Sequence, residues 1–114
     1  MTQARSSAVR LRDAAPVFAA LGDQTRLELV ARLCSNGPQS IVRLSEGANV
    51  TRQAITKHLH VLAEAGLIRS TRAGREQVWE ILPRRVAEAR QFLVLISAQW
   101  DDALERLRKF VETD

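Results

Sequence analysis

Hydrophobic residues recur every three or four positions through the first third of the chain, which is the spacing of amphipathic helices. The pattern predicts a first helix from about Val9 to Leu21, with Pro16 as an awkward interruption. Asp23 is placed to cap a second helix, and Gly37-Pro38 would end it. Residues 1–8 show no such pattern and are expected to form a flexible tail.

Two more helices are predicted in quick succession at the centre of the chain. Ser40 is placed to cap a short helix over Ile41–Glu46, which ends at Gly47. After a brief connection, Thr51 caps a further helix that stops at Gly66. Two helices joined in this way are typical of a helix-turn-helix, whose second helix lies in the major groove of DNA.

Beyond Gly66 the hydrophobic pattern changes from helical spacing toward alternation. Leu67–Arg72 and Glu76–Leu82 are predicted to form two strands, joined by a turn at Ala73-Gly74-Arg75 and ended by Pro83. The glycine of the turn can adopt the positive φ that a tight hairpin requires. A hairpin in this place predicts a wing beside the helix-turn-helix.

The last part of the chain is predicted to be one long helix over residues 84–112, along which apolar residues alternate between spacings of three and four. About 28 residues rising 1.5 Å each would span roughly 42 Å, whereas a compact domain of this size has a radius of gyration of about 13 Å. The chain alone therefore cannot bury this apolar seam, and a second copy of the chain is the expected partner. The predicted dimer interface comprises Phe18, Phe92, Leu93, Ile96, Trp100, Leu104 and Leu107.

Together these elements predict a mainly α fold with a two-stranded β-wing: a winged helix-turn-helix of four helices and a hairpin, followed by the long C-terminal helix. At 114 residues the chain is expected to be one structural domain. Within it, residues 9–83 would form the DNA-binding part and residues 84–114 the dimerisation helix.

Positive charge is concentrated at the centre of the sequence. The net charge of +4 comes from 17 Lys and Arg against 13 Asp and Glu. Residues 51–75 hold five of these basic residues and a single acidic one, Glu64, whereas from Arg84 onward the two signs balance. A polyanion such as DNA would be attracted to this central segment.

The predicted recognition helix carries suitable chemistry on the face opposite its apolar side. With Ile55, Leu59 and Leu62 pointing inward, glutamine, arginine, lysine and threonine side chains project outward. Glutamine can pair with adenine, arginine or lysine with guanine, and threonine offers a hydroxyl and a methyl group. The expected DNA contacts are Thr51, Arg52, Gln53, Thr56, Lys57, His58 and His60, with Arg72 and Arg75 at the hairpin tip.

Two motifs in this region resemble those of the ArsR-type winged-helix repressors. They are Ala20–Arg26 and Val50–Ile68, and the likeness runs in clear register from about Ala14 to Leu82. The resemblance implies a prokaryotic homodimer that binds a palindromic operator in double-stranded DNA. It also implies that the protein usually represses transcription by blocking access to the promoter.

The chain departs from the metal-sensing members of that family. Those members carry Cys-x-Cys in the short helix before the recognition helix, where this chain has Ser40-Ile41-Val42-Arg43-Leu44. Other members use Asp and His ligands in the last helix, which here contains no His. His58 and His60 are two apart on a helix and cannot bind one ion together. No metal and no cofactor are therefore expected.

Several side chains allow two interpretations. His58 could touch a phosphate or pack beside Leu62. Cys34 is expected to be buried and inert, with a redox role as the alternative. Trp79 is expected to anchor the wing, and Trp100 to fill the seam unless it lines a pocket for a hydrophobic effector. The inducing signal stays open between a small hydrophobic ligand, thiol oxidation at Cys34, and none.

The sequence also argues against other classes of function. It holds no nucleophile–base set and no phosphate-binding glycine loop, so an enzyme is not expected. It begins without the apolar segment of a signal peptide, and its longest apolar run, Phe92–Ile96, cannot span a bilayer, which favours a cytoplasmic protein. The rival interpretation is a winged-helix protein-interaction scaffold, which would have no need of the polar outer face of the recognition helix.

Overall fold

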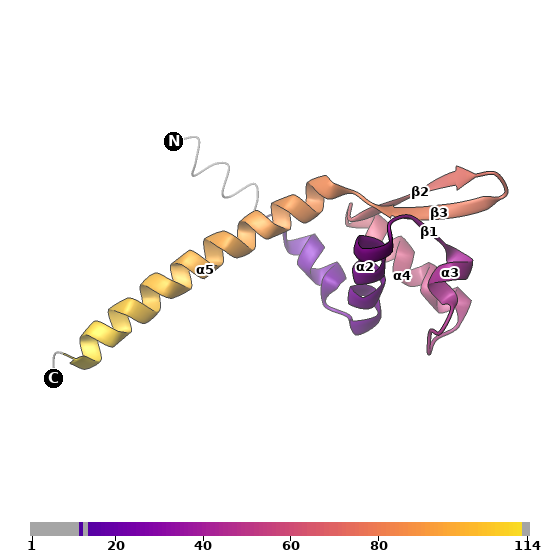
Figure 1. Ribbon diagram of the computed structural model, residues 1–114. Helices are drawn as coiled ribbons and strands as arrows, with labels where there is room; N and C mark the ends of the chain where they lie inside the picture. The colour runs from indigo at the N-terminus through magenta and orange to yellow at the C-terminus, as the bar shows by residue number, and fades with distance from the viewer. Residues whose placement is uncertain (1–11, 13, 113–114) are drawn as a thin grey trace.

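The computed structural model describes residue 12 and residues 14–112, and the predicted tail at residues 1–8 lies outside them. The elements follow the predicted order, with one added strand (Figure 1). They are the N-terminal helix at residues 14–21, α2 (Gln24–Asn36), β1 (Gln39–Ser40), α3 (Ile41–Ser45), α4 (Arg52–Glu64), β2 (Ile68–Ala73), β3 (Glu76–Ile81) and α5 (Pro83–Glu112). The fold is a mainly helical winged helix-turn-helix with a long C-terminal helix, as predicted.

Side-chain caps begin the three central helices at the predicted positions. Asp23, Ser40 and Thr51 have extended backbones, and each side chain accepts from the N–H three residues on, at 3.0, 3.3 and 3.1 Å. These bonds satisfy amide groups that have no partner within the first helical turn. Gly37 and Gly66 follow α2 and α4 with φ of 76° and 81°, a conformation that glycine adopts without strain. Local chemistry therefore sets the ends of both helices.

The wing belongs to a three-stranded antiparallel sheet in the order β1-β3-β2. The sequence pattern does not predict β1, because two residues are too few to show alternation. This strand exists because Gln39 and Ser40 pair with Trp79 and Val78 of β3. The pairing joins the start of α3 directly to the wing.

The hairpin turn is one residue shorter than predicted. Ala73 pairs with Glu76, so β2 extends past Arg72 and the turn consists of Gly74 and Arg75 alone. Gly74 has a φ of 66°, which such a two-residue turn needs at its first position. The pairing along both strands, and not the local turn residues, decides where the hairpin closes.

The core lies where the inner faces of α2, α3 and α4 meet the sheet and the N-terminal helix. Its buried residues are Val17, Ala20, Leu29, Leu33, Leu44, Ile55, Leu59, Leu62, Leu67, Ile68, Trp79 and Ala89. Trp79 is 4% exposed, so the prediction that it anchors the wing to the core is confirmed. This burial holds the wing in a fixed position beside α4.

Two expectations for the first half of the chain are wrong. The helix at residues 14–21 continues through Pro16, because the proline ring holds φ near the helical value and removes only one bond from the ladder. Cys34 is exposed instead of buried. The inward position of α2 here is Leu33, and the next residue along a helix is turned about 100° from it, toward solvent.

The long helix α5 has 30 residues and begins at Pro83, one residue before the predicted start. Proline suits the first helical position because its φ is already helical and its missing N–H is not needed there. Leu93, Trp100 and Leu107 are 51%, 63% and 59% exposed. The C-terminal half of α5 extends away from all other labelled elements (Figure 1). Within one chain, the apolar seam is therefore uncovered.

The elongated outline of the molecule follows from this helix. The radius of gyration is 18.5 Å, whereas a compact domain of similar length has a value of about 13 Å. Among the described residues, no helix combines the length and hydropathy needed to cross a membrane, and this includes α5.

Candidate nucleic-acid interface

The helix α4 separates its apolar and polar side chains on two faces. Ile55, Leu59 and Leu62 point into the core, and each is at most 2% exposed. Short α3 packs against α4 after the turn at residues 46–51, which completes the helix-turn-helix. The apolar face fixes α4 to the domain and leaves its other face open to solvent.

Three of the residues on α4 that are predicted to contact DNA have exposed side chains without intramolecular bonds. The side chains of Arg52, Gln53 and Lys57 make no hydrogen bond or ion pair within the described part of the chain. Arg52 and Gln53 lie in the first turn of the helix, and Lys57 follows one turn later. Their donor and acceptor groups are therefore available to a ligand at the N-terminal half of α4.

The two threonines of the predicted set already make bonds within the helix. The Thr51 hydroxyl oxygen accepts from the backbone N–H of Ala54, and the Thr56 hydroxyl donates to the carbonyl of Arg52 at 3.0 Å. Thr51 therefore keeps a hydroxyl hydrogen to donate, whereas Thr56 offers an acceptor and a methyl group.

The two histidines face different neighbours. His58 is turned toward α2, where its Nδ1 lies 3.2 Å from Arg26 Nη1 and 3.8 Å from Asp23 Oδ2. His60 lies edge-on to Trp79, with ring centroids 5.8 Å apart and an interplanar angle of 88°. His58 is half-buried and His60 is exposed. The helical spacing separates them, as expected for residues two apart.

Sequence reasoning misses the polar partners of His58. The Asp23 carboxylate caps α2, and its bond from the Arg26 N–H lowers the pKa of that carboxyl, as does the positive charge of Arg26. Both residues belong to the Ala20–Arg26 motif, which is the signal that could have drawn attention to them. Periodicity alone cannot show that residues 32 positions apart meet.

On the wing, two of the three arginines are available to a ligand. Arg69 pairs with Glu80 across the strands at 2.7 Å, which neutralises its charge locally. Arg72, near the end of β2, and Arg75, in the turn, are exposed and have no such partner within the described residues. The hairpin thus presents two unpaired guanidinium groups near its tip.

Comparison with known proteins identifies the family. A family model described as a helix-turn-helix domain matches residues 21–71. The HTH-type transcriptional regulator Rv2034 of Mycobacterium tuberculosis is 32% identical over 95 residues, which are 83% of this chain and 85% of that relative. The solved ArsR-like transcriptional regulator from Rhodococcus sp. RHA1 is 36% identical with a TM-score of 0.72, over 88% of this chain and 93% of that one. This chain belongs to the ArsR family of winged helix-turn-helix transcriptional regulators.

A more distant structure shares the same fold. It is described as the homodimeric winged helix-turn-helix DNA-binding domain of a possible ArsR-family regulator from Mycobacterium bovis. It is 21% identical, with a TM-score of 0.61 over 83% of this chain and 84% of that fragment. Family membership makes the ArsR-family chain a regulator of transcription and not an enzyme, as predicted.

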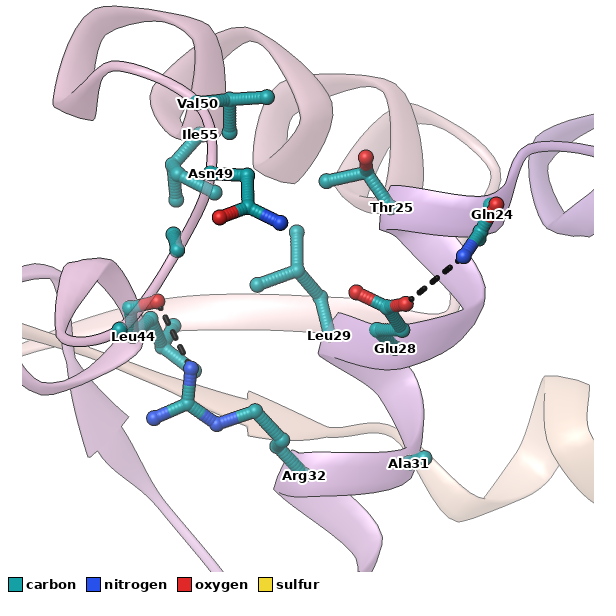
Figure 2. Close-up of a pocket in the computed structure, with 12 residues that line it drawn as sticks. Gln24, Thr25, Glu28, Leu29, Ala31, Arg32, Leu44, Asn49, Val50 and Ile55 are labelled. Atoms are coloured by element: carbon teal, nitrogen blue, oxygen red, sulfur yellow. Dashed lines mark hydrogen bonds between the residues drawn. The ribbon is translucent and has the colours of Figure 1, made fainter.

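In this ArsR-family regulator, Arg32 of α2 makes hydrogen bonds to the first helix of the helix-turn-helix, α3. Its guanidinium donates to the carbonyl of Leu44 at 2.9 Å (Figure 2) and to that of Arg43 at 2.8 Å, at the C-terminal end of α3. The Arg43 carbonyl also accepts from the backbone N–H of Glu46 at 3.2 Å, and the positive charge of Arg32 suits a helix C-terminus. Arg32 therefore ties α3 to α2.

A cavity of about 580 Å³ lies between α2 and the turn of the helix-turn-helix (Figure 2). Its floor is formed by Leu29, Leu44 and Ile55, each at most 3% exposed. Polar side chains of α2 line its rim, including Gln24, which donates to Glu28 at 3.2 Å. The cavity is therefore a groove with an apolar floor and polar side chains along its α2 side.

In residue 12 and residues 14–112, no three His, Cys, Asp or Glu side chains lie close enough to hold one ion. The thiol of Cys34 is exposed on α2.

Proposed function

We propose that this ArsR-family regulator is a homodimeric repressor that binds a pseudo-palindromic operator in double-stranded DNA. The observation that carries the proposal is the exposed row formed by Arg52, Gln53 and Lys57 on α4, backed by a completely buried apolar face. A protein-interaction scaffold has no need of such unoccupied donors and acceptors, whereas they match the base edges of the major groove.

Some of these residues would contact DNA bases and others the DNA backbone. Arg52, Gln53, Thr56 and Lys57 would meet base edges. Thr51 would donate its remaining hydroxyl hydrogen to a phosphate at the N-terminus of α4. Arg72, Arg75 and His60 would contact the backbone flanking the groove. His58 stands apart from this set because its Nδ1 already has partners.

A second copy of the chain would cover the apolar seam of α5. The seam comprises Leu93, Ile96, Trp100, Leu104 and Leu107. The rings of Phe18 and Phe92 lie 5.8 Å apart and tilted by 49°, so the N-terminal helix and α5 form one continuous surface. The homodimer described for the Mycobacterium bovis relative supports this assembly. Its two-fold symmetry would place one α4 on each half of the operator.

Repression would follow from occupation of the promoter, and its relief would not depend on a metal ion. Where metal-sensing members carry Cys-x-Cys, the ArsR-family chain has Ser40–Leu44, and α5 contains no His. Neither segment therefore offers, at the positions used by metal-sensing members, the sulfur or imidazole donors that transition metals prefer.

Selection of bound sequences from random double-stranded DNA tests the proposal. We expect an inverted repeat whose half-sites are separated by about one helical turn or a multiple of it, near 10 base pairs. Light scattering behind a sizing column should give the mass of two chains, free and on DNA. Absence of sequence enrichment at physiological salt would contradict the proposal and favour the scaffold function.

A further inference from the structure

We infer that Arg26 and His58 form a bridge that positions the recognition helix α4 relative to the N-terminal helix, so that His58 affects DNA affinity through Arg26 and not by touching DNA. This inference rests on the proposed function, since it concerns how the DNA-reading helix is held. It makes Arg26 and His58 positioning residues.

The bridge joins three elements. Arg26 lies in the first turn of α2, and its Nε donates to the carbonyl of Ala20 near the end of the N-terminal helix. Its Nη1 lies 3.2 Å from Nδ1 of His58, in the second turn of α4. One half-buried guanidinium therefore connects the helix at the proposed dimer surface with the helix proposed to read DNA.

The bond between Arg26 and His58 requires one form of the imidazole. A guanidinium only donates, so Nδ1 of His58 must accept, and the ring is then neutral with its hydrogen on Nε2. Asp23 Oδ2 lies 3.8 Å from the same nitrogen. At that distance Asp23 makes no hydrogen bond to Nδ1, so Arg26 is the closer partner of this nitrogen.

A directional bond adds a further constraint on the orientation of α4 to the one that core packing supplies. Ile55 and Leu59 hold α4 by burial, and the hydrophobic driving force for this burial is non-directional. Base readout requires donors placed within a fraction of an ångström, so a small rotation of α4 weakens it. Phe18, whose ring packs against that of Phe92 of α5, is two residues from Ala20. The bridge thus begins close to the seam.

Two single variants, His58→Asn and His58→Gln, distinguish a positioning role of His58 from a direct contact with DNA. The Asn Oδ1 is attached to Cγ, as Nδ1 is in histidine, so His58→Asn keeps an acceptor for Arg26. The Gln amide reaches farther, toward the position of Nε2, so His58→Gln loses that acceptor. Operator DNA obtained by the selection above serves as the probe, and fluorescence anisotropy measures affinity at fixed salt.

We expect His58→Asn to bind within about twofold of the wild type, and His58→Gln and Arg26→Ala to bind about three- to tenfold more weakly. The Arg26→Ala/His58→Gln double variant should be no weaker than either single variant, because both changes break the same bond. The salt dependence of His58→Gln should match that of the wild type.

Arg106→Ala is the matched control, since it removes the same charge from an exposed position on α5. Thermal melting of each variant separates weaker binding from loss of the fold. Equal affinities for the two His58 amides, losses that multiply in the double variant, or a salt slope reduced by about one unit in His58→Gln would overturn the inference. A wild type that selects no sequence would instead overturn the proposed function, and the inference with it.

Discussion

The part of the chain from α2 to β3, here called the reading part, differs from the helix α5 in how its apolar side chains are covered. From α2 to β3, large apolar residues such as Leu44, Leu59 and Leu62 are completely buried by neighbouring elements of the same chain. Along α5, Trp100 and Phe110 are 63% and 72% exposed. Natural monomers rarely expose a continuous apolar stripe of this kind. The apolar residues of the first region are covered within one chain, whereas we propose that a second copy covers those of α5.

The largest effect is expected from a truncation inside the reading part. Leu59→Ala removes a fully buried side chain from the centre of α4 and should lower the free energy of unfolding by about 2–5 kcal/mol. Denaturant titration measures this change. Val61→Ala, on the exposed side of the same helix, is the control and should change it by less than about 1 kcal/mol. Similar losses in both variants would show that the core is not where the structure places it.

A charge in the seam should break assembly while the reading part stays folded. Leu104→Glu would bury an unpaired carboxylate in the proposed interface and raise the dimer dissociation constant by about a hundredfold or more. Analytical ultracentrifugation measures the constant, and circular dichroism should show unchanged helix content. Gln99→Glu, also exposed on α5, is the control with the same charge. An intact Leu104→Glu dimer would place the interface elsewhere.

Within the reading part, loss of a base contact should reduce sequence discrimination, whereas loss of a backbone contact should reduce affinity for every DNA sequence. Gln53→Ala should lose about 1–3 kcal/mol of discrimination at one base pair of each half-site. Affinities for single-base operator variants, measured at one salt concentration, test this. Uniform weakening across all of these variants would contradict a base contact by Gln53.

Arg75→Ala should weaken binding to every sequence and lower the slope of log affinity against log salt by about one unit per contact. Titrations at several salt concentrations measure the slope. The control is Arg69→Ala, since that guanidinium is already paired with Glu80 and should contribute less. If both variants behave alike, the two free arginines of the wing have no special role.

The smallest effect concerns acid stability at the cap of α2. The pKa of Asp23 is lowered in the folded protein, so its stabilising contribution is present above the ordinary carboxyl pKa and is lost as pH falls through the lowered value. Asn can still cap but cannot ionise. Melting temperatures of the wild type and Asp23→Asn should therefore differ more at about pH 6 than at about pH 2. A constant difference would show that ionisation of Asp23 does not stabilise the fold.

Features that depend on interactions between residues close together in the sequence could be predicted best. The caps at Asp23, Ser40 and Thr51 act over three residues, so the helix starts are readable from local chemistry. The outer face of α4 follows from helical spacing in the same way. Burial of single side chains is less certain, as Cys34 shows, because one step along a helix changes inside to outside.

Long-range pairings could not be read from periodicity. Strand β1 exists through its pairing with β3 some 40 residues later in the chain, and His58 meets Arg26 across 32 positions. Both depend on how the helices pack, which no local pattern reports. The candidate DNA contacts on α4 were found from its amphipathic pattern, whereas the residues that orient α4 appear only in the folded chain.

The connection between the sheet and α5 is a single residue. Leu82 alone separates β3 from α5, and its N–H is held by the carbonyl of Leu67 at 2.8 Å. A helix turns about 100° per residue, so one inserted residue would swing the seam a quarter-turn around its axis relative to the wing. In the proposed dimer, the length of this link would therefore set the direction in which the two chains meet, and with it the spacing and tilt of the two α4 helices on DNA.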